Sequence, residues 1–171
     1  GRPFIIGIKE PKRRFIDLPG VASRINKESG ERVEVSELKL SSRDDLRRIK
    51  TRATMTEKTY RAIVNIEREV NEDDIKRLLD EISGATIKQK TPLRVLHRRA
   101  DRVRLKKVYD LYIKIITPMQ IEVVVKTQGG LYVKELVTGD SGRTTPSFSE
   151  ILGAKAECIE LDVLDVAEQL V

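Results

Sequence analysis

The sequence predicts an α+β protein with a mixed or antiparallel sheet and short flanking helices, forming one unit. Hydrophobic residues make up 39% of the 171 residues, which can supply a core, and only 4% are aromatic, so that core is mostly Ile, Leu and Val. Several segments alternate apolar and polar residues with the period of a strand, and others have the i, i+3, i+4 spacing of a helix. A strict strand–helix alternation, which a doubly wound parallel sheet requires, is absent.

Apolar or alternating segments mark the strands. In chain order the predicted strands are 2–9, 32–40, 58–68, 102–116, 119–126 and 157–164. The longest alternation is in 102–116, where one face is predicted to hold Val103, Leu105, Tyr109, Leu111, Ile113 and Ile115. The other face is predicted to hold Arg102, Arg104, Lys106, Asp110, Tyr112 and Lys114. With 119–126 this strand predicts a long antiparallel hairpin with one basic face.

The first two predicted helices begin near residues 18 and 42. Residues 18–27 have a helical pattern that Gly30 ends. Ser42 and Asp45 have the spacing of a capping box, so the next helix is predicted to begin there.

Three further segments are predicted after residue 70. Asn71 and Asp74 predict the cap of a helix that ends near Gly84. Its apolar stripe is Ile75, Leu78, Leu79 and Ile82. Residues 131–137 predict a short helical segment, and 142–149 predict a polar loop.

The composition excludes several classes of site. Cys158 is the single cysteine, so the chain has no internal disulfide framework and no cysteine-cluster zinc site. His97 is the single histidine, which leaves little for a histidine-based metal site. No apolar run approaches the roughly 20 residues of a membrane span. We expect a cytoplasmic protein of a reducing compartment that is a monomer and does not contact a membrane.

The positive charge is concentrated in one segment. Residues 88–107, here called the basic segment, hold nine lysines and arginines against the single acid Asp101, a net charge of +8. The rest of the chain sums to −2, although the whole chain is +6. Such a segment favours a polyanion partner, because each phosphate that it neutralises releases counterions. A solvated charged surface is the alternative.

Two short motifs suggest the chemistry. Residues 57–62 contain a K-x-Y-x-A strand, and residues 129–136 contain G-x-Y-x-K. Each motif is weak alone, but together with the basic segment they resemble the later motifs of the pseudouridine synthase superfamily. An aromatic platform beside a fixed cation is what chemistry on a flipped base needs.

Longer stretches strengthen the resemblance. They are GRPF at 1–4, PKRRF at 11–15, TPLRVLHRRAD at 91–101 and GGLYVKELVTGDSGRTTPSFSEILG at 129–153. These stretches are similar to the archaeal tRNA pseudouridine synthase family that modifies the adjacent T-loop uridines, tRNA positions 54 and 55. The resemblance extends over nearly the whole chain and implies that residues 1–171 are the C-terminal part of a pseudouridine synthase catalytic domain.

The resemblance implies roles for individual residues. Tyr60 would stack on the target base, and Tyr132 and Leu136 would also bind substrate. Lys134 would be the catalytic cation, paired with a nucleophilic aspartate upstream of Gly1. The residues expected to contact tRNA are Arg94, His97, Arg98, Arg99, Arg102, Arg104 and Arg143. For His97 we favour a phosphate or backbone contact over acid–base catalysis. The implied reaction uses no cofactor and no metal.

One departure from the family bears on the mechanism. In the family the nucleophilic aspartate lies in a segment just before GRPF, and this sequence starts at GRPF, with Gly1. The aspartate segment and the N-terminal RNA-binding region of the family are therefore outside these residues, and we expect the chain alone to be inactive. A non-catalytic RNA-binding module, of the ribosomal or RNA-chaperone type, is the alternative function.

The requirement that a base platform and a catalytic cation be close predicts that Tyr60, Tyr132 and Lys134 border one cleft.

Overall fold

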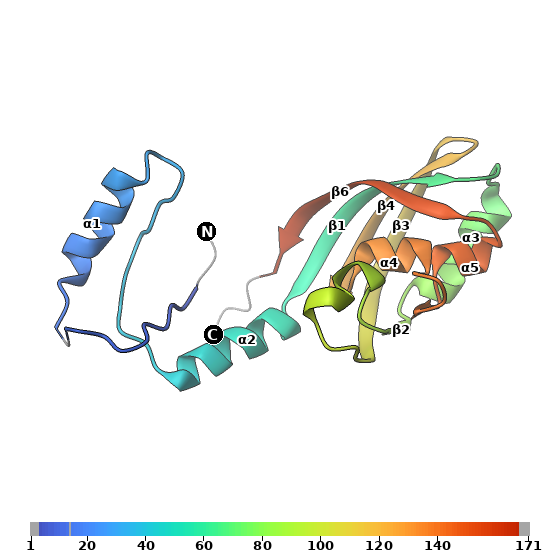
Figure 1. Cartoon of the computed structure of the whole chain (residues 1–171). Helices are drawn as coiled ribbons and strands as arrows, with labels where there is room; N and C mark the ends of the chain where they lie inside the picture. The colour runs from blue at the N-terminus through green and yellow to red at the C-terminus, as the bar shows by residue number, and fades with distance from the viewer. Residues whose placement is uncertain (1–3, 14, 168–171) are drawn as a thin grey trace. The chain divides into compact units, whose positions relative to one another are not determined.

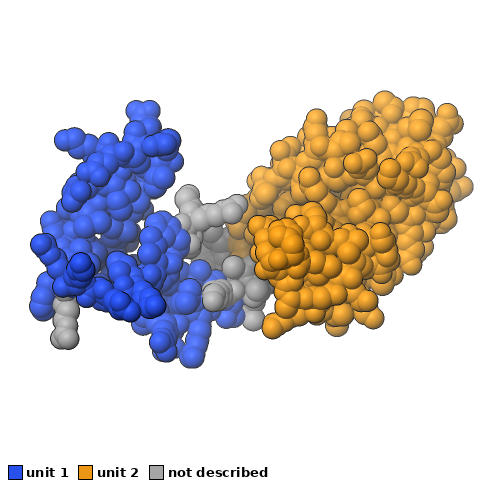
Figure 2. Space-filling view, viewed as in Figure 1, with its two compact units in different colours: residues 1–52 blue, residues 53–171 orange. Residues whose placement is uncertain are grey.

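The computed structural model describes residues 4–13 and 15–167, without the side chains of residues 50 and 52–55. The chain divides into two compact units, residues 1–52 and 53–171 (Figure 2), which corrects the expectation of a single unit. No helix in the described part is long and apolar enough to cross a membrane.

The first unit holds one helix and the start of another. Helix α1 (Leu18–Glu28) begins at Asp17, whose carboxylate accepts from the Gly20 amide at 3.1 Å. Helix α2 (Arg43–Met55) begins with the predicted capping box, because the Ser42 hydroxyl and the Asp45 carboxylate each accept the other's backbone N–H. Both helices confirm the starts predicted from sequence.

Neither strand predicted for the first unit forms. Residues 32–40 have no strand partner among the described residues, and the side chain of Asn26 instead bonds both the N–H and the C=O of Val35. Residues 4–9 are outside any strand and mostly exposed, and positions 2 and 3 of that predicted strand lie outside the described residues. An apolar run alone cannot form a strand, since a strand needs a neighbour for its backbone hydrogen bonds.

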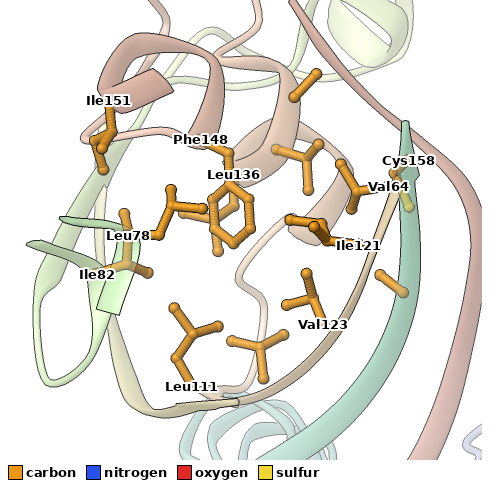
Figure 3. Close-up of a cluster of buried hydrophobic side chains, with 14 of the residues drawn as sticks. Val64, Leu78, Ile82, Leu111, Ile121, Val123, Leu136, Phe148, Ile151 and Cys158 are labelled. Atoms are coloured by element: carbon orange, nitrogen blue, oxygen red, sulfur yellow. The ribbon is translucent and has the colours of Figure 1, made fainter. Parts of the chain in front are cut away.

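The second unit is a six-stranded, wholly antiparallel sheet in the order β5-β2-β3-β4-β1-β6 (Figure 1). The elements in chain order are β1 (Glu57–Ile66), α3 (Glu72–Ile82), β2 (Thr86–Gln89), the 3₁₀ helix η1 (Leu93–Arg98), β3 (Arg104–Thr117), β4 (Gln120–Gln128), α4 (Val133–Thr138), β5 (Thr144–Thr145), α5 (Phe148–Leu152) and β6 (Ala156–Val166). The core lies between one face of this sheet and helices α3, α4 and α5 (Figure 3). The α+β antiparallel prediction is confirmed.

The predicted faces of β3 are wrong over its first half. Lys106 and Val108 point into the protein, whereas Leu105 is 64% exposed. A bulge follows, because Val108 pairs with Thr127 and the next pair is Asp110 with Lys126. The extra residue shifts the alternation by one, so the prediction becomes correct from Leu111 onward.

The predicted polar loop at 142–149 contains more structure than its composition indicates. Strand β5 pairs with β2, and Ser147 caps α5 through its hydroxyl, which accepts from the Glu150 amide. Phe148, at the start of α5, is completely buried in the core. A single aromatic among Ser, Thr and Pro gives no periodic signal, so the sequence did not predict this helix.

Helix α3 is attached to the rest of the unit by a buried ion pair. Asp74 is 3% exposed and accepts from both Arg68 and Arg77, while Arg68 also donates to the Leu152 carbonyl at the end of α5. The hydrogen bonds from Arg68 hold the pKa of the Asp74 carboxyl well below its ordinary value of 3.8.

We expect Asp74→Asn to lower the free energy of unfolding by about 2 kcal/mol at pH 7, because charged hydrogen bonds are lost from a buried site. A carboxyl whose folded pKa is lowered stabilises the fold above its unfolded pKa, so the difference between variant and parent should shrink as the pH falls below about 4. Chemical denaturation at several pH values measures this. Asp73→Asn, one exposed residue earlier, is the control; a difference that stays constant down to about pH 2 would contradict the assignment.

Candidate nucleobase cleft and basic segment

A cleft of about 260 Å³ lies where β1, η1, α4 and β6 meet. Its lining consists of Tyr60, Arg94, Leu131, Tyr132, Val133, Lys134 and Leu161. The structure therefore brings Tyr60, Tyr132 and Lys134 to one cleft, as predicted from sequence, although Tyr60 is far from the other two along the chain. Their chemical roles stay predictions.

Tyr60 forms one wall because of the register of β1. It pairs with Val125 on β4 and with Val163 on β6, and a bulge between Thr59 and Tyr60 interrupts the ladder with β6. Tyr60 shares the core face with Ala62 and Val64, which are buried, but is itself only half-buried at the end of the core. An aromatic ring in that position presents an apolar surface to the cleft.

Tyr132 forms another wall and is held by two arginines. The Arg99 guanidinium donates to the Tyr132 hydroxyl at 2.8 Å, and the Arg94 guanidinium lies 5.9 Å from the centroid of the ring. A cation over an aromatic face is attracted to the ring's quadrupole. Arg94 and Arg99, both predicted to contact RNA, therefore also shape the cleft.

Lys134 is an exposed cation in the first turn of α4. Within the described ranges it forms no ion pair, and no Asp or Glu is among the residues that line the cleft. Its positive charge is thus available to an anion that enters the cleft. Gly1, upstream of which the partner aspartate is expected, lies outside the described residues, so the pairing of that aspartate with Lys134 stays a prediction.

The described part of the chain offers no metal centre. No group of three or more His, Cys, Asp and Glu side chains among the described residues could hold a metal ion. His97 lies in η1 and is not among the residues of the cleft wall.

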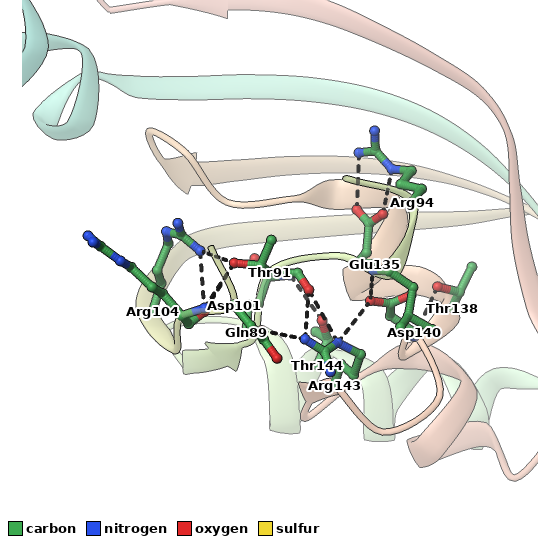
Figure 4. A network of polar contacts seen from close by, with 12 residues as sticks. Gln89, Thr91, Arg94, Asp101, Arg104, Glu135, Thr138, Asp140, Arg143 and Thr144 are labelled. Carbon is green, nitrogen blue, oxygen red and sulfur yellow. Dashed lines mark hydrogen bonds and ion pairs between the residues drawn. The ribbon is translucent and has the colours of Figure 1, made fainter. Parts of the chain in front are cut away.

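Glu135 is a buried carboxylate that the sequence pattern did not indicate. It is 4% exposed, and its oxygens accept from Arg94 Nε at 2.7 Å and Nη2 at 3.4 Å (Figure 4). The hydrogen bond to Glu135 raises the pKa of Arg94. Since Arg94 also faces the ring of Tyr132, this ion pair links α4, η1 and the cleft.

Two of the predicted site residues are engaged inside the protein. Leu136 is 1% exposed in the core and is not part of the cleft wall, so the substrate contact expected of it is corrected to a packing role. Arg143 donates to the Thr91 carbonyl at 2.9 and 3.2 Å and pairs with Asp101 (Figure 4). Its guanidinium therefore fixes the loop that holds η1, and its RNA contact stays a prediction.

The rest of the basic segment is divided between exposed and engaged cations. His97 and Arg98, at the end of η1, and Arg102, which follows it, are exposed. Arg104 is half-buried and donates to the Thr91 hydroxyl at 3.0 Å, and Lys106 is buried. The connection between β2 and β3 therefore carries exposed cations, and Arg104 helps to hold it through Thr91.

Leu161 is a second cleft residue that the sequence pattern did not indicate. It lies on β6 beside Ala62 of β1 and faces the same cleft as Tyr60. In the sequence it is one of several aliphatic residues in the last strand, and only the pairing of β6 with β1 distinguishes it.

Comparisons with known proteins give a consistent result. The family model described as "Pus10, C-terminal" matches residues 1–167. The curated "tRNA pseudouridine synthase Pus10" of Korarchaeum cryptofilum is 48% identical over 166 residues, 97% of this chain and 44% of that protein. The protein of the same name from Pyrococcus furiosus is 43% identical over 170 residues, 99% of this chain and 43% of that protein.

The chain thus spans about two-fifths of the length of these curated relatives. A solved structure titled "Crystal Structure of a Cbf5-Nop10-Gar1 Complex" contains a chain similar to this one, with a TM-score of 0.54 and 25% identity. The match covers 70% of this chain and 33% of that chain.

Replacing Arg94 with Met should leave the Glu135 carboxylate buried without its cation. We expect the free energy of unfolding to fall by about 2 kcal/mol, and the double variant Arg94→Met/Glu135→Leu to recover most of that loss. Chemical denaturation of the two single variants and the double variant measures the coupling. Arg98→Met, which removes an exposed charge from the same 3₁₀ helix, should change stability by less than about 0.5 kcal/mol. Additive losses in the double variant would show that the pair is not coupled.

Proposed function

The chain belongs to the family described as "Pus10, C-terminal", and from this premise we propose that the protein to which it belongs converts uridine to pseudouridine in tRNA. The observation on which the proposal depends is the cleft in which Tyr60, Tyr132 and the exposed cation Lys134 meet. The substrate positions that we propose are the adjacent T-loop uridines 54 and 55, and the proposed location is the cytoplasm.

The cleft suits the steps of the reaction. A carboxylate attacks C1′ of the ribose, or removes the C2′ proton, and the N1–C1′ bond breaks to release the uracil. The uracil rotates and its C5 bonds to C1′ as the carboxylate leaves that carbon or, on the second route, as the carboxyl group returns the proton to C2′. The proton on C5 is then lost as N1 gains one, so substrate and product are isomers. Tyr60 and Leu161 would hold the detached base between apolar surfaces during the rotation.

Lys134 would act on the carboxylate. A cation at the mouth of the cleft favours the ionised form of an aspartate placed there, and the aspartate must be ionised to attack. Because no acidic side chain lines the cleft within the described residues, we propose that this aspartate is supplied by a segment upstream of Gly1, outside the 171 residues.

The exposed part of the basic segment would hold the RNA backbone. His97, Arg98 and Arg102 lie on the connection between β2 and β3, which includes η1. The same connection contains Arg94 and Arg99, two residues that contact Tyr132. A phosphate bound to these cations would bring its nucleotide next to the cleft. The RNA-binding module without catalysis is not favoured by the comparisons, because the relatives from Korarchaeum cryptofilum and Pyrococcus furiosus are named as synthases.

Replacing Arg98, Arg99 and Arg102 together with Ala should weaken binding of a T-arm RNA. Each lost phosphate contact removes about 0.7–0.9 from the slope of log K against log salt, so the triple variant should flatten that slope by about 2. Fluorescence anisotropy at several salt concentrations measures both effects. The matched control is a triple variant that loses the same charge elsewhere, with Ala at Lys39, Lys76 and Lys114. An equal slope in both triple variants would assign the arginines a structural role.

Activity tests the cleft itself. In a version of the protein extended upstream through the aspartate motif, Lys134→Met should lower the rate of pseudouridine formation by about 100-fold or more, because an electrostatic contact at the reacting groups is lost. Tyr60→Phe keeps the ring and should retain most of the rate, whereas Tyr60→Ala should not. Carbodiimide mapping of pseudouridine in T-arm RNA is the assay. The 171-residue chain alone should be inactive; activity from it would mean that one of its own aspartates is the nucleophile.

A further inference from the structure

Gln89, on β2, holds the main chain of Tyr132. Its side-chain NH₂ donates to the Tyr132 carbonyl and its side-chain carbonyl accepts from the Tyr132 N–H, both at 3.0 Å. Gln89 is 1% exposed, and its NH₂ also lies 3.4 Å from the Thr144 hydroxyl. A side-chain amide that bonds both backbone groups of one residue fixes that residue as a neighbouring strand would.

Lys106, on β3, holds the beginning of the same turn. Its ammonium group donates to the Gly129 carbonyl at 2.7 Å, is buried, and forms no ion pair within the described ranges. Gly130 has a φ of +86°, and a Cβ there would stand 3.4 Å from the Lys106 ammonium. Residues other than glycine rarely adopt a φ in this range, so glycine is favoured at the position where the turn approaches Lys106.

The two contacts enclose residues 129–132, the connection that leads from β4 into α4. Lys106 bonds it at its first residue, Gly129, and Gln89 bonds it at its last, Tyr132, after which α4 begins. Neither Gln89 nor Lys106 lines the cleft. A buried lysine without a carboxylate costs free energy, so a purely packing role would be met better by an apolar residue.

We propose that Gln89 and Lys106 are positioning residues that hold Tyr132 in the orientation required to bind the target base. This inference rests on the function proposed above, because it assigns Tyr132 to the substrate side of the cleft. Arg99 and Arg94 contact the ring of Tyr132, whereas Gln89 and Lys106 fix its backbone and the turn before it. Backbone and ring together leave Tyr132 little freedom, which lowers the entropy lost when a base binds.

The tyrosines themselves provide the readout. The chain has four, so a chain labelled with 3-fluorotyrosine gives four ¹⁹F resonances that single Tyr→Phe variants assign. We expect Gln89→Leu and Lys106→Met to shift or broaden the Tyr132 resonance and to weaken binding of a T-arm RNA by about tenfold. Thr144→Val removes the third partner of Gln89 and should leave the Tyr132 resonance and the RNA affinity unchanged. Lys107→Met should move the resonance of Tyr109, over whose ring Lys107 lies, and not that of Tyr132.

Gln89→Glu keeps the proposal testable if Gln89→Leu does not fold. The carboxylate that this substitution introduces would, when ionised, accept from the Tyr132 N–H but repel the Tyr132 carbonyl. When protonated, the same carboxyl group would donate to that carbonyl and restore both bonds. The Tyr132 resonance of the Gln89→Glu variant should therefore return to its parental position as the pH is lowered.

A Tyr132 resonance and an RNA affinity that are both unchanged in folded Gln89→Leu would overturn the positioning role, as would an absence of pH dependence in Gln89→Glu. The resonance could instead move while neither Gln89→Leu nor Tyr132→Ala alters RNA binding. That result would support the positioning of Tyr132 by Gln89 but contradict the proposed function of the cleft.

Discussion

The register of β1 between β4 and β6 is the constraint on which the cleft depends. Because side chains alternate along a strand, the pairing of Tyr60 with Val125 and Val163 places its ring on the core side of the sheet. A slip of one residue would turn Tyr60 to the opposite face, away from α4. Buried Ala62 and Val64 on the same face make that slip costly, so the hydrophobic core also determines where the ring of Tyr60 lies.

The cations of the basic segment fall into two groups, those bonded within the protein and those exposed to solvent. Lys106 binds a backbone carbonyl and Arg94 binds Glu135 beside the cleft, so these cations stabilise the fold around the site. Arg98, at the end of η1, and Arg102, which follows it, remain open to solvent. A net charge counted from sequence therefore overstates the number of cations available to a polyanion, and only the contacts of each side chain within the protein distinguish the two groups.

Local signals predicted local structure well. The Asn71 capping box predicted the start of α3, and the alternation around Tyr60 predicted β1. The sequence could not predict the bulge near Tyr109, because a bulge is settled by pairing with another strand rather than by residues along its own. For the same reason Leu136 was placed in the site and Leu161 was not: which leucine reaches the cleft depends on how α4 and β6 pack.

The central claim is that the cleft between Tyr60 and Tyr132 receives the target base. Photocrosslinking tests it most directly: a T-arm RNA with 4-thiouridine at the target position is irradiated with the protein, and the crosslinked peptides are identified by mass spectrometry. We predict crosslinks to peptides containing Tyr60, Tyr132 or Leu161. Excess unmodified T-arm RNA should suppress these crosslinks by competing for the same site. Competed crosslinks confined to the far end of the sheet, around Met119 and Gln120, would contradict the claim.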